Sequence, residues 1–443
     1  MEINDLYIER FNNLINQADL IKLNGKVTDV VGLVIVSSGP NVTLGEICTI
    51  VNKAGQEVCK VEVVGFKEGK VLSIALGEVE KISPLCEIIA SGQSFTIGVG
   101  ETLLGRVIDG LGNPIDGKGM LDFSSYRRIH SSPPNPMERN RISEPLQTGV
   151  RTIDALLTCG RGQRVGIFAG SGVGKSVLLG MIARNTNADV NVIVLVGERG
   201  REVREFIEKD LGEEGLKRSV VVVATSDNPA LLRIKAAMIG TTFAEYFRDL
   251  GKNVVLMMDS VTRFAMAQRE IGLTVGEPPT TKGYTPSVFA ILPKLLERAG
   301  NSRVGSITGF YTVLVDGDDF TEPIADAVRS ILDGHIVLSR KLAHKGQFPA
   351  IDPLQSVSRI MPDIVSEDHY KRSSTFNEIL ATYNEAEDLI NIGAYVKGSN
   401  PQIDHALQKI NSLRNFLKQD MKEKSIYKET VQKLKTLIEP NLI

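Results

Sequence analysis

The sequence predicts an α/β protein with a small N-terminal β-barrel, a central and mostly parallel α/β domain, and a C-terminal helical domain. Three observations support this fold class. Short β-rich runs fill residues 20–92, apolar strand-like runs alternate with helical stretches from residue 164 to 315, and only helical patterns follow residue 362. A chain of 443 residues is too long for one ordinary core. We therefore expect domains at 20–92, 93–362 and 363–443, after a helix within 1–19.

The N-terminal segment 5–18 has the spacing of a short amphipathic helix. Its apolar side chains recur at intervals of three and four, with polar residues between them, at Tyr7, Phe11, Leu14, Ile15 and Ala18. This stripe has two open interpretations, docking of a partner protein and packing on its own chain.

The next segment, 20–92, has the short, closely spaced strands of a small barrel. The strand candidates are Gly25–Val27, Gly32–Val36, Val58–Val64 and Val71–Leu76. Phe66 is the only aromatic residue between Leu20 and Gln93, so the barrel lacks the stacking platform of single-strand nucleic-acid binders.

A connecting stretch leads into the central domain, with a turn cluster at 109–114 and a proline-rich linker at 131–136. Five buried-strand candidates then alternate with helical stretches, at Val165–Phe168, Val190–Val196, Ser219–Ala224, Val254–Met258 and Val304–Val315. This alternation predicts a mostly parallel sheet covered on both faces. Beyond it, residues 376–392 and 402–437 are predicted to be helices.

Charge and composition exclude several functional classes. Lys plus Arg (51) nearly balances Asp plus Glu (53), which gives no electrostatic reason to expect a nucleic-acid partner. The four cysteines lack metal-ligand spacing and cannot form a disulfide framework, which favours reduced thiols. No apolar run approaches the roughly 20 residues of a membrane-spanning helix, and the polar start lacks the layout of a signal peptide. We expect a cytoplasmic protein.

The strongest local motif is a glycine-rich loop at residues 169–176, between a predicted strand and a predicted helix. The motif is Ala169-Gly170-Ser171-Gly172-Val173-Gly174-Lys175-Ser176, and the predicted helix begins at Val177. Such a loop turns successive backbone N–H groups toward phosphate oxygens, Lys175 reaches the terminal phosphates, and Ser176 offers a hydroxyl to Mg²⁺. The first position is alanine where the strict pattern has glycine, a small change at the start of the loop. The motif predicts binding of ATP with Mg²⁺.

Two carboxylates follow predicted strands and complete a candidate site, because ligands of open parallel sheets lie beyond the carboxyl ends of the strands. Asp259 ends the run 254–258 and is expected to hold Mg²⁺ through its water shell. Glu198 follows the run 190–196 and can align water for attack on the γ-phosphate. The alternative for Glu198 is a surface ion pair with Arg199 or Arg201.

At these residues the chain resembles a known family, the catalytic subunits of rotary ATP synthases and the related type III secretion ATPases. The similarity covers nearly the whole chain and implies a RecA-like P-loop ATPase domain. Its segments are 105–110, Gly197-Glu198-Arg199, and the signature at 349–358. The run 263–289 is more similar to the secretion ATPases than to synthase β subunits. Thr280-Thr281-Lys282 and the amphipathic start look flagellar, with a virulence-system ATPase as the alternative.

The resemblance also implies roles for residues outside the loop. Arg359 is similar to the family's arginine finger, supplied by a neighbouring subunit to stabilise charge on the transferring phosphoryl group. Its alternative is an ion pair within its own chain. Phe348 sits where the family places an aromatic against adenine, with core packing as the alternative. Arg199 and Arg263 are candidate phosphate contacts, and contact with Glu198 is the alternative for Arg263.

The partners implied by the resemblance are those of an export motor. They are further copies of the chain, in a ring that the resemblance implies to be hexameric, a stator-like regulator at the N-terminal helix, chaperones and substrates at the C-terminal domain, a central stalk, and a membrane export gate that holds the protein at the inner membrane. The rivals are an RNA-dependent ring ATPase and a non-catalytic or synthase-type ring subunit. The lack of an aromatic stacking platform on the barrel and the nearly balanced charge argue against an RNA-dependent ATPase. Glu198 argues against a non-catalytic subunit.

Overall fold

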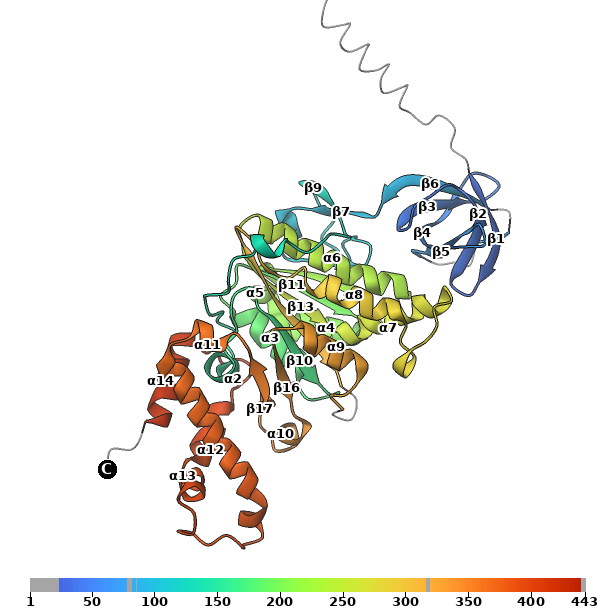
Figure 1. Ribbon diagram of the computed structural model, residues 1–443. Coiled ribbons are helices and arrows are strands. Elements are labelled where there is room, and N and C mark those ends of the chain that lie inside the picture. Colours follow the sequence, from blue (N-terminus) through green and yellow to red (C-terminus); the bar gives the residue numbers. More distant parts are fainter. Residues whose placement is uncertain (1–23, 78–81, 85, 316–318, 440–443) are drawn as a thin grey trace, which may run out of the picture. The chain divides into compact units, whose positions relative to one another are not determined.

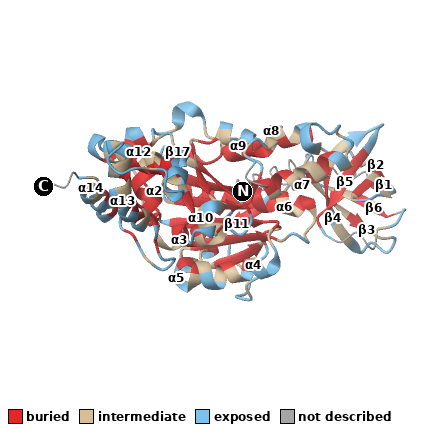
Figure 2. Cartoon of the chain, turned by 90° about the horizontal axis from the view of Figure 1, so that it is seen from below, coloured by how far each residue is buried: buried red, intermediate tan, exposed pale blue. Residues whose placement is uncertain are grey.

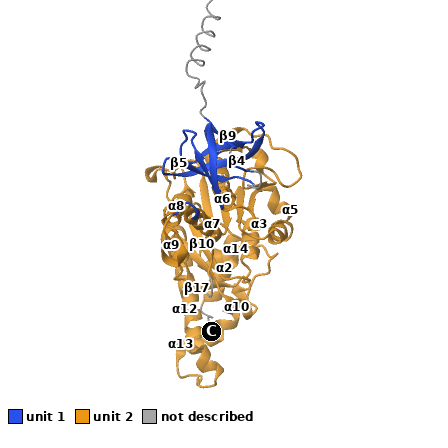
Figure 3. Cartoon of the chain, turned by 90° about the vertical axis from the view of Figure 1, so that its right-hand side faces the viewer, with its two compact units in different colours: residues 1–95, 274–276 blue, residues 96–273, 277–443 orange. Residues whose placement is uncertain are grey.

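The chain folds into two compact units, shown in the computed structural model of Figures 1 and 3. The structure describes residues 24–77, 82–84, 86–315 and 319–439. One unit spans residues 1–95 with 274–276, and the other spans 96–273 and 277–443. The predicted amphipathic helix at 5–18 lies outside the described residues. None of the helices in the described ranges has the length and apolar composition to cross a membrane.

The N-terminal unit contains a closed barrel of antiparallel strands, in the order β1-β2-β5-β4-β3-β6. The strands are β1 (Gly25–Val31), β2 (Val34–Ser38), β3 (Glu46–Val51), β4 (Glu57–Lys67), β5 (Lys70–Ala75) and β6 (Glu87–Ser94). Alternate side chains such as Ile35, Ile50 and Val61 fill its interior. The barrel is confirmed, although β3 and β6 were not among the predicted strands. All four cysteines of the chain are free.

The second unit is built on a sheet whose main path runs β17-β16-β10-β15-β13-β11-β12-β8. Its strands are β8 (Arg106–Asp109), β10 (Arg164–Ala169), β11 (Val190–Val196), β12 (Ser219–Ala224), β13 (Asn253–Asp259), β15 (Ser306–Leu314), β16 (Gly334–Leu338) and β17 (Ile351–Ser358). Along this path, each pair of neighbouring strands from β16 to β8 is parallel, and β17 at the edge is antiparallel to β16. The five predicted strands are confirmed, and the segments 105–110 and 349–358 add edge strands. A short strand, β14 (Gly300–Asn301), pairs with β15, and β7 (Thr96–Val99) pairs with β9 (Ser125–Arg128).

Helices cover both faces of this sheet, so its inner strands, such as β11, β12 and β13, are buried (red in Figure 2) and are nearly continuous apolar runs, whereas the edge strand β17 is partly exposed. The helices of the nucleotide-binding part are α2 (Arg151–Leu156), α3 (Lys175–Asn185), α4 (Gly200–Glu205), α5 (Gly212–Lys217), α6 (Ala230–Asp249), α7 (Val261–Thr274), α8 (Pro286–Leu296), α9 (Pro323–Ile331) and α10 (Arg340–His344). A π-helical turn, η3 (Phe206–Leu211), joins α4 to α5, and 3-10 turns lie at η1 (Glu101–Leu103), η2 (Pro136–Glu138) and η4 (Thr281–Gly283).

The C-terminal helices are α11 (Met361–Ile364), α12 (Glu367–Asn391), α13 (Pro401–Leu417) and α14 (Tyr427–Ile438). The prediction of one helix over 402–437 is wrong, because the chain leaves the helix between residues 418 and 426. The guanidinium of Arg151 donates to the carbonyls of Phe416 and Lys418, which a continued helix would need. Gln419 accepts from the backbone N–H of Arg151 and is buried. Helix α12 begins nine residues before the predicted start, since Ser366 caps it.

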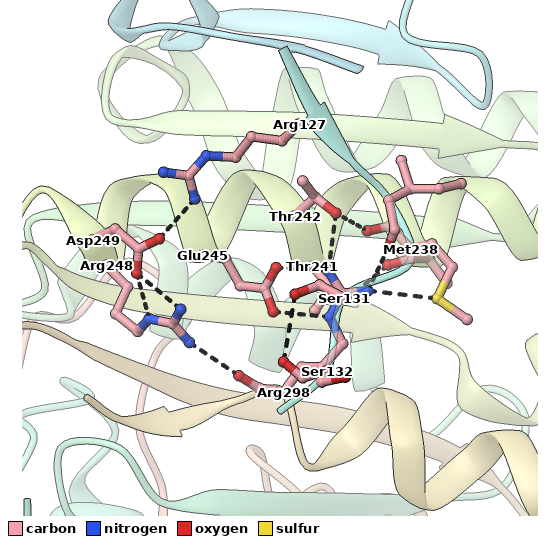
Figure 4. Close-up of polar contacts among 12 residues, drawn as sticks. Arg127, Ser131, Ser132, Met238, Thr241, Thr242, Glu245, Arg248, Asp249 and Arg298 are labelled. Atoms are coloured by element: carbon pink, nitrogen blue, oxygen red, sulfur yellow. Dashed lines mark hydrogen bonds and ion pairs between the residues drawn. The ribbon is translucent and has the colours of Figure 1, made fainter. Parts of the chain in front are cut away.

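A buried ion pair joins Arg298 to α6, and the same arginine also binds the segment around Ile129 (Figure 4). Arg298, after α8, donates twice to Glu245 of α6, at 2.9 and 2.7 Å. It also donates to the carbonyl of Ile129 at 2.8 Å and to the hydroxyl of Thr242 at 3.0 Å. The side chains of Arg298 and Glu245 are 2% and 6% exposed, so each charge depends on the other for compensation.

Candidate active site

The glycine-rich loop joins the carboxyl end of β10 to the start of α3, as the motif requires. Gly172 and Gly174 have φ angles of 77° and 91°, a region that side chains disfavour. An added Cβ at Gly172 would meet nothing within 4 Å, so this part of the loop opens to solvent. Ala169, which departs from the strict pattern, is the last residue of β10 and is buried. Its methyl group is therefore part of the buried sheet.

Lys175 is held between the two predicted carboxylates. Its Nζ lies 2.6 Å from Oδ1 of Asp259 and 3.4 Å from Oε1 of Glu198. The side chains of Lys175, Asp259 and Glu198 are 12%, 4% and 18% exposed. They come from α3, the end of β13 and the turn after β11, because neighbouring parallel strands bring their carboxyl ends to one edge. The three residues predicted from separate motifs therefore form one cluster.

Burial and charge shift the pKa values of this cluster. The pKa of Lys175 is raised: burial works against the ammonium, but Asp259 and Glu198 outweigh it. Burial raises the pKa of Glu198, the charge of Asp259 raises it further, and Lys175 opposes both. Lys175 consequently stays cationic, and Glu198 is a stronger base than a solvated glutamate. Both properties suit phosphate binding and water alignment.

The turn after β11 leaves room only for glycine. Gly197 has a φ of 73°, and an added Cβ would lie 2.9 Å from Cβ of Arg263 and 3.0 Å from its Cγ. The stem of Arg263 therefore packs against the residue that precedes Glu198, while its Nε is buried without a hydrogen-bond partner among the described residues. Arg199 instead faces solvent, with its side chain 80% exposed, and pairs with Glu202 at 3.4 Å. The surface-pair alternative for Glu198 is wrong, because Glu198 pairs with Lys175.

Phe348 and Arg359 lie on either side of the signature. The ring of Phe348 comes within 3.8 Å of an added Cβ at Gly174, and Phe348 is 49% exposed, which argues against the core-packing alternative. Arg359 is exposed and donates to the carbonyl of Leu332 at 3.3 Å. Within the described part of the chain Arg359 forms no ion pair, so its own-chain alternative finds no support. The structure does not bring Arg359 into contact with Lys175.

One residue of the cluster carries no sequence motif. Thr312 of β15 donates to Oδ1 of Asp259 at 2.7 Å. The only signal in the sequence is a hydroxyl inside an otherwise apolar strand, which needs a partner when buried.

The donor set fits a metal held jointly with phosphate. Within the described residues, no group of three or more His, Cys, Asp or Glu side chains could hold a metal ion alone. The groups at this edge suited to a metal are the buried carboxylate of Asp259 and the hydroxyl of Ser176 at the helix start, beside the ammonium of Lys175 and the second carboxylate, Glu198. Mg²⁺ commonly takes one or two such protein oxygens and completes its shell with water and substrate phosphates.

This sheet, loop and cluster define a P-loop nucleotide-binding enzyme. Residues 149–358 match the model of the ATP synthase alpha/beta family, nucleotide-binding domain, and residues 365–436 match the T3SS EscN ATPase C-terminal domain. The chain is 58% identical to a flagellum-specific ATP synthase of Bacillus subtilis, over 96% of this chain and 97% of that protein. It is 52% identical to a type 3 secretion system ATPase of Xanthomonas euvesicatoria, over 93% of each.

Solved structures agree. The assembled ATPase EscN of the enteropathogenic E. coli type III secretion system is 46% identical, with a TM-score of 0.89 over 94% of this chain and all of that one. EscN in complex with its central stalk EscO matches with a TM-score of 0.87 and 45% identity, over the same shares. The chain belongs to the family of flagellum-specific ATP synthases and type 3 secretion system ATPases, and it is an ATPase.

Proposed function

We propose that the chain hydrolyses Mg·ATP to energise bacterial flagellar protein export. The observation that carries the proposal is the position of Lys175, at the start of the loop helix and between Asp259 and Glu198. We choose the flagellar system on the 58% identity with one flagellum-specific relative; other flagellum-specific relatives, at 49% and 50%, are less identical than the type 3 secretion relative at 52%. The Thr280-Thr281-Lys282 segment supports the same choice. A virulence-type secretion ATPase is the second candidate, since the two systems share this site.

The residues divide the reaction among them. The phosphates are bound by the backbone of residues 170–174, which include Val173, and by the start of α3, which includes Ser176 and Val177. Lys175 places its charge on the terminal phosphates. Ser176 and Asp259 would hold Mg²⁺, which neutralises charge on the phosphate oxygens when bound. Glu198 aligns the attacking water, and its raised pKa favours acceptance of a proton. Arg199 and Arg263 remain candidate phosphate contacts, and Phe348 is positioned beside the loop for the adenine ring.

A charge-neutral substitution tests the role of Glu198. Glu198→Gln keeps the shape and removes the base, so we expect the turnover number to fall by about 10²- to 10⁴-fold, while nucleotide binding persists. Lys175→Ala should lose both ATP turnover and nucleotide binding. The matched control is Glu205→Gln on the exposed face of α4, which should hydrolyse ATP like the parent. Turnover of Glu198→Gln at the parental rate would refute the assignment. Added RNA should leave the rate unchanged, and stimulation would favour the RNA-dependent rival.

Arg359 is proposed to act on the site of a neighbouring subunit in a ring, which is hexameric by analogy with the family. Its exposed side chain, which forms no ion pair within the described part of the chain and donates only to the carbonyl of Leu332, supports this arrangement. The assembled state of EscN and its central stalk EscO make a ring around a stalk the natural model for this chain. Chaperones, a regulator at the N-terminal helix and attachment to the export gate at the cytoplasmic face of the inner membrane belong to the same proposal.

Mixing two inactive variants tests this arrangement. Lys175→Ala and Arg359→Ala subunits are each expected to be inactive alone. In randomly mixed cyclic rings, about one quarter of the sites would combine an intact Lys175 with a neighbour's intact Arg359, and activity should return to that extent. If Arg359 serves its own subunit, no mixed site is complete and the mixture stays inactive. The parent's specific activity should also rise with protein concentration.

A further inference from the structure

The buried threonine beside the site makes a contact that packing alone does not require. Thr312 lies on β15 next to β13 and is fully buried. Its Oγ1 is 2.7 Å from Oδ1 of Asp259 and 3.3 Å from the carbonyl of Met258. A hydroxyl has one proton to donate, and the shorter contact leads to a charged acceptor, which forms the stronger bond. Thr312 therefore donates its hydroxyl proton in a hydrogen bond to Asp259.

The two oxygens of Asp259 have unequal surroundings. Oδ1 accepts from Lys175 at 2.6 Å and from Thr312 at 2.7 Å. Oδ2 has no hydrogen-bond partner among the residues that the structure describes. The carboxylate torsion of an aspartate is broad and nearly two-fold, so an unrestrained Asp259 would exchange the two oxygens. Donors on Oδ1 keep Oδ2 as the oxygen available to a metal or its water.

Lys175 cannot be the lasting restraint, because its ammonium also serves the terminal phosphates in the proposed reaction. Thr312 has no such competing task, since it is buried behind Asp259 within the sheet. We infer that Thr312 is a positioning residue that fixes the Asp259 carboxylate on Oδ1 and presents Oδ2 to Mg²⁺. This inference rests on the proposed function, in which Asp259 organises the metal.

The test compares nucleotide binding with and without the metal. Affinity for ADP is measured by calorimetry in Mg²⁺ and in EDTA, for the parent, Thr312→Val and Thr312→Ser. Loss of such a supporting contact typically weakens metal affinity by roughly 10- to 100-fold. We expect Thr312→Val to lose most of the gain that Mg²⁺ gives, to match the parent in EDTA, and to need more Mg²⁺ for half-maximal binding. Thr312→Ser keeps the hydroxyl and should restore the parental behaviour.

Thr308→Val is the matched control. Thr308 lies four residues earlier on β15, is 1% exposed, and accepts from the N–H of Gly162, away from the carboxyl edge. It should retain the full effect of Mg²⁺. Should Thr312→Val fail to fold by circular dichroism, Thr312→Ala, which places no methyl group against the carboxylate, is judged by the same criteria.

Two results would overturn the inference while the proposed function stands. One is a Thr312 variant without the hydroxyl that keeps the parental gain from Mg²⁺. The other is an equal loss of ADP affinity in Mg²⁺ and in EDTA, which would indicate a structural role only. If the parent itself binds ADP equally with and without Mg²⁺, the proposed metal site fails, and the inference fails with it.

Discussion

Substitution of Gly197 should disable the site without touching a charged group. In Gly197→Ala the new Cβ would lie 2.9 Å from Cβ of Arg263, in a residue whose φ is 73°. The left-handed conformation costs about 1–2 kcal/mol for a residue other than glycine, and forced overpacking costs about 1–3 kcal/mol. The expected loss of stability is therefore about 2–5 kcal/mol, unless the turn moves. If it moves, Glu198 moves with it, and a displacement of about 1 Å costs roughly 10²-fold in rate.

The assay measures ATP turnover and thermal unfolding, followed by circular dichroism because the chain has no tryptophan. Gly200→Ala is the matched control, since Gly200 begins α4 and an added Cβ there meets nothing within 4 Å. Alanine is also the better helix former by about 1 kcal/mol, so this variant should be at least as stable as the parent and equally active. A Gly197→Ala protein with parental turnover and parental unfolding would show that this turn tolerates a side chain.

Two further predictions concern stability. Arg298→Met leaves Glu245 buried without its partner, which costs about 3–5 kcal/mol, so its thermal midpoint should fall sharply and the double variant with Glu245→Met should recover part of the loss; a double variant no more stable than the single one would contradict this. Hydrogen bonds from Arg106 hold the pKa of Asp116 well below its usual range, against the opposing effect of burial. A depressed carboxylate pKa stabilises the fold above the unfolded value of about 3.9, and this contribution is lost as the pH falls through the folded value. Asp116→Asn should thus lower the thermal midpoint at pH 7 and reduce the further decline of that midpoint in acid. Parallel declines in the parent and the variant would exclude the Arg106–Asp116 pair as a cause of the loss of stability in acid.

Local motifs carried much of the candidate site. The glycines and Lys175 were predictable because the phosphate loop needs nothing beyond consecutive residues and its flanking strand and helix. Asp259 and Glu198 were predictable as strand-end carboxylates, since carboxyl ends of parallel strands meet at one edge. Thr312 could not be assigned in this way. A lone hydroxyl in an apolar strand shows that a partner is needed and leaves open which residue supplies it.

The C-terminal helices show the same limit. The helical pattern over residues 402–437 is nearly continuous, yet α13 ends at Leu417. The cause is Arg151, which lies 265 residues away from Phe416 along the chain and takes its carbonyl. A contact at such sequence separation leaves no trace in local periodicity, because propensity describes only neighbours within a few turns.

The α/β class, the barrel, the phosphate loop and the family were all predictable from the residues alone, because each depends on short-range patterns or on similarity along the chain. The pairing of polar groups became clear from the folded chain alone: Glu198 pairs with Lys175 and not with Arg199, and Thr312 pairs with Asp259. The physical reason is that the strength of charged hydrogen bonds depends on distance and burial, and folding alone sets both for residues that are remote in sequence.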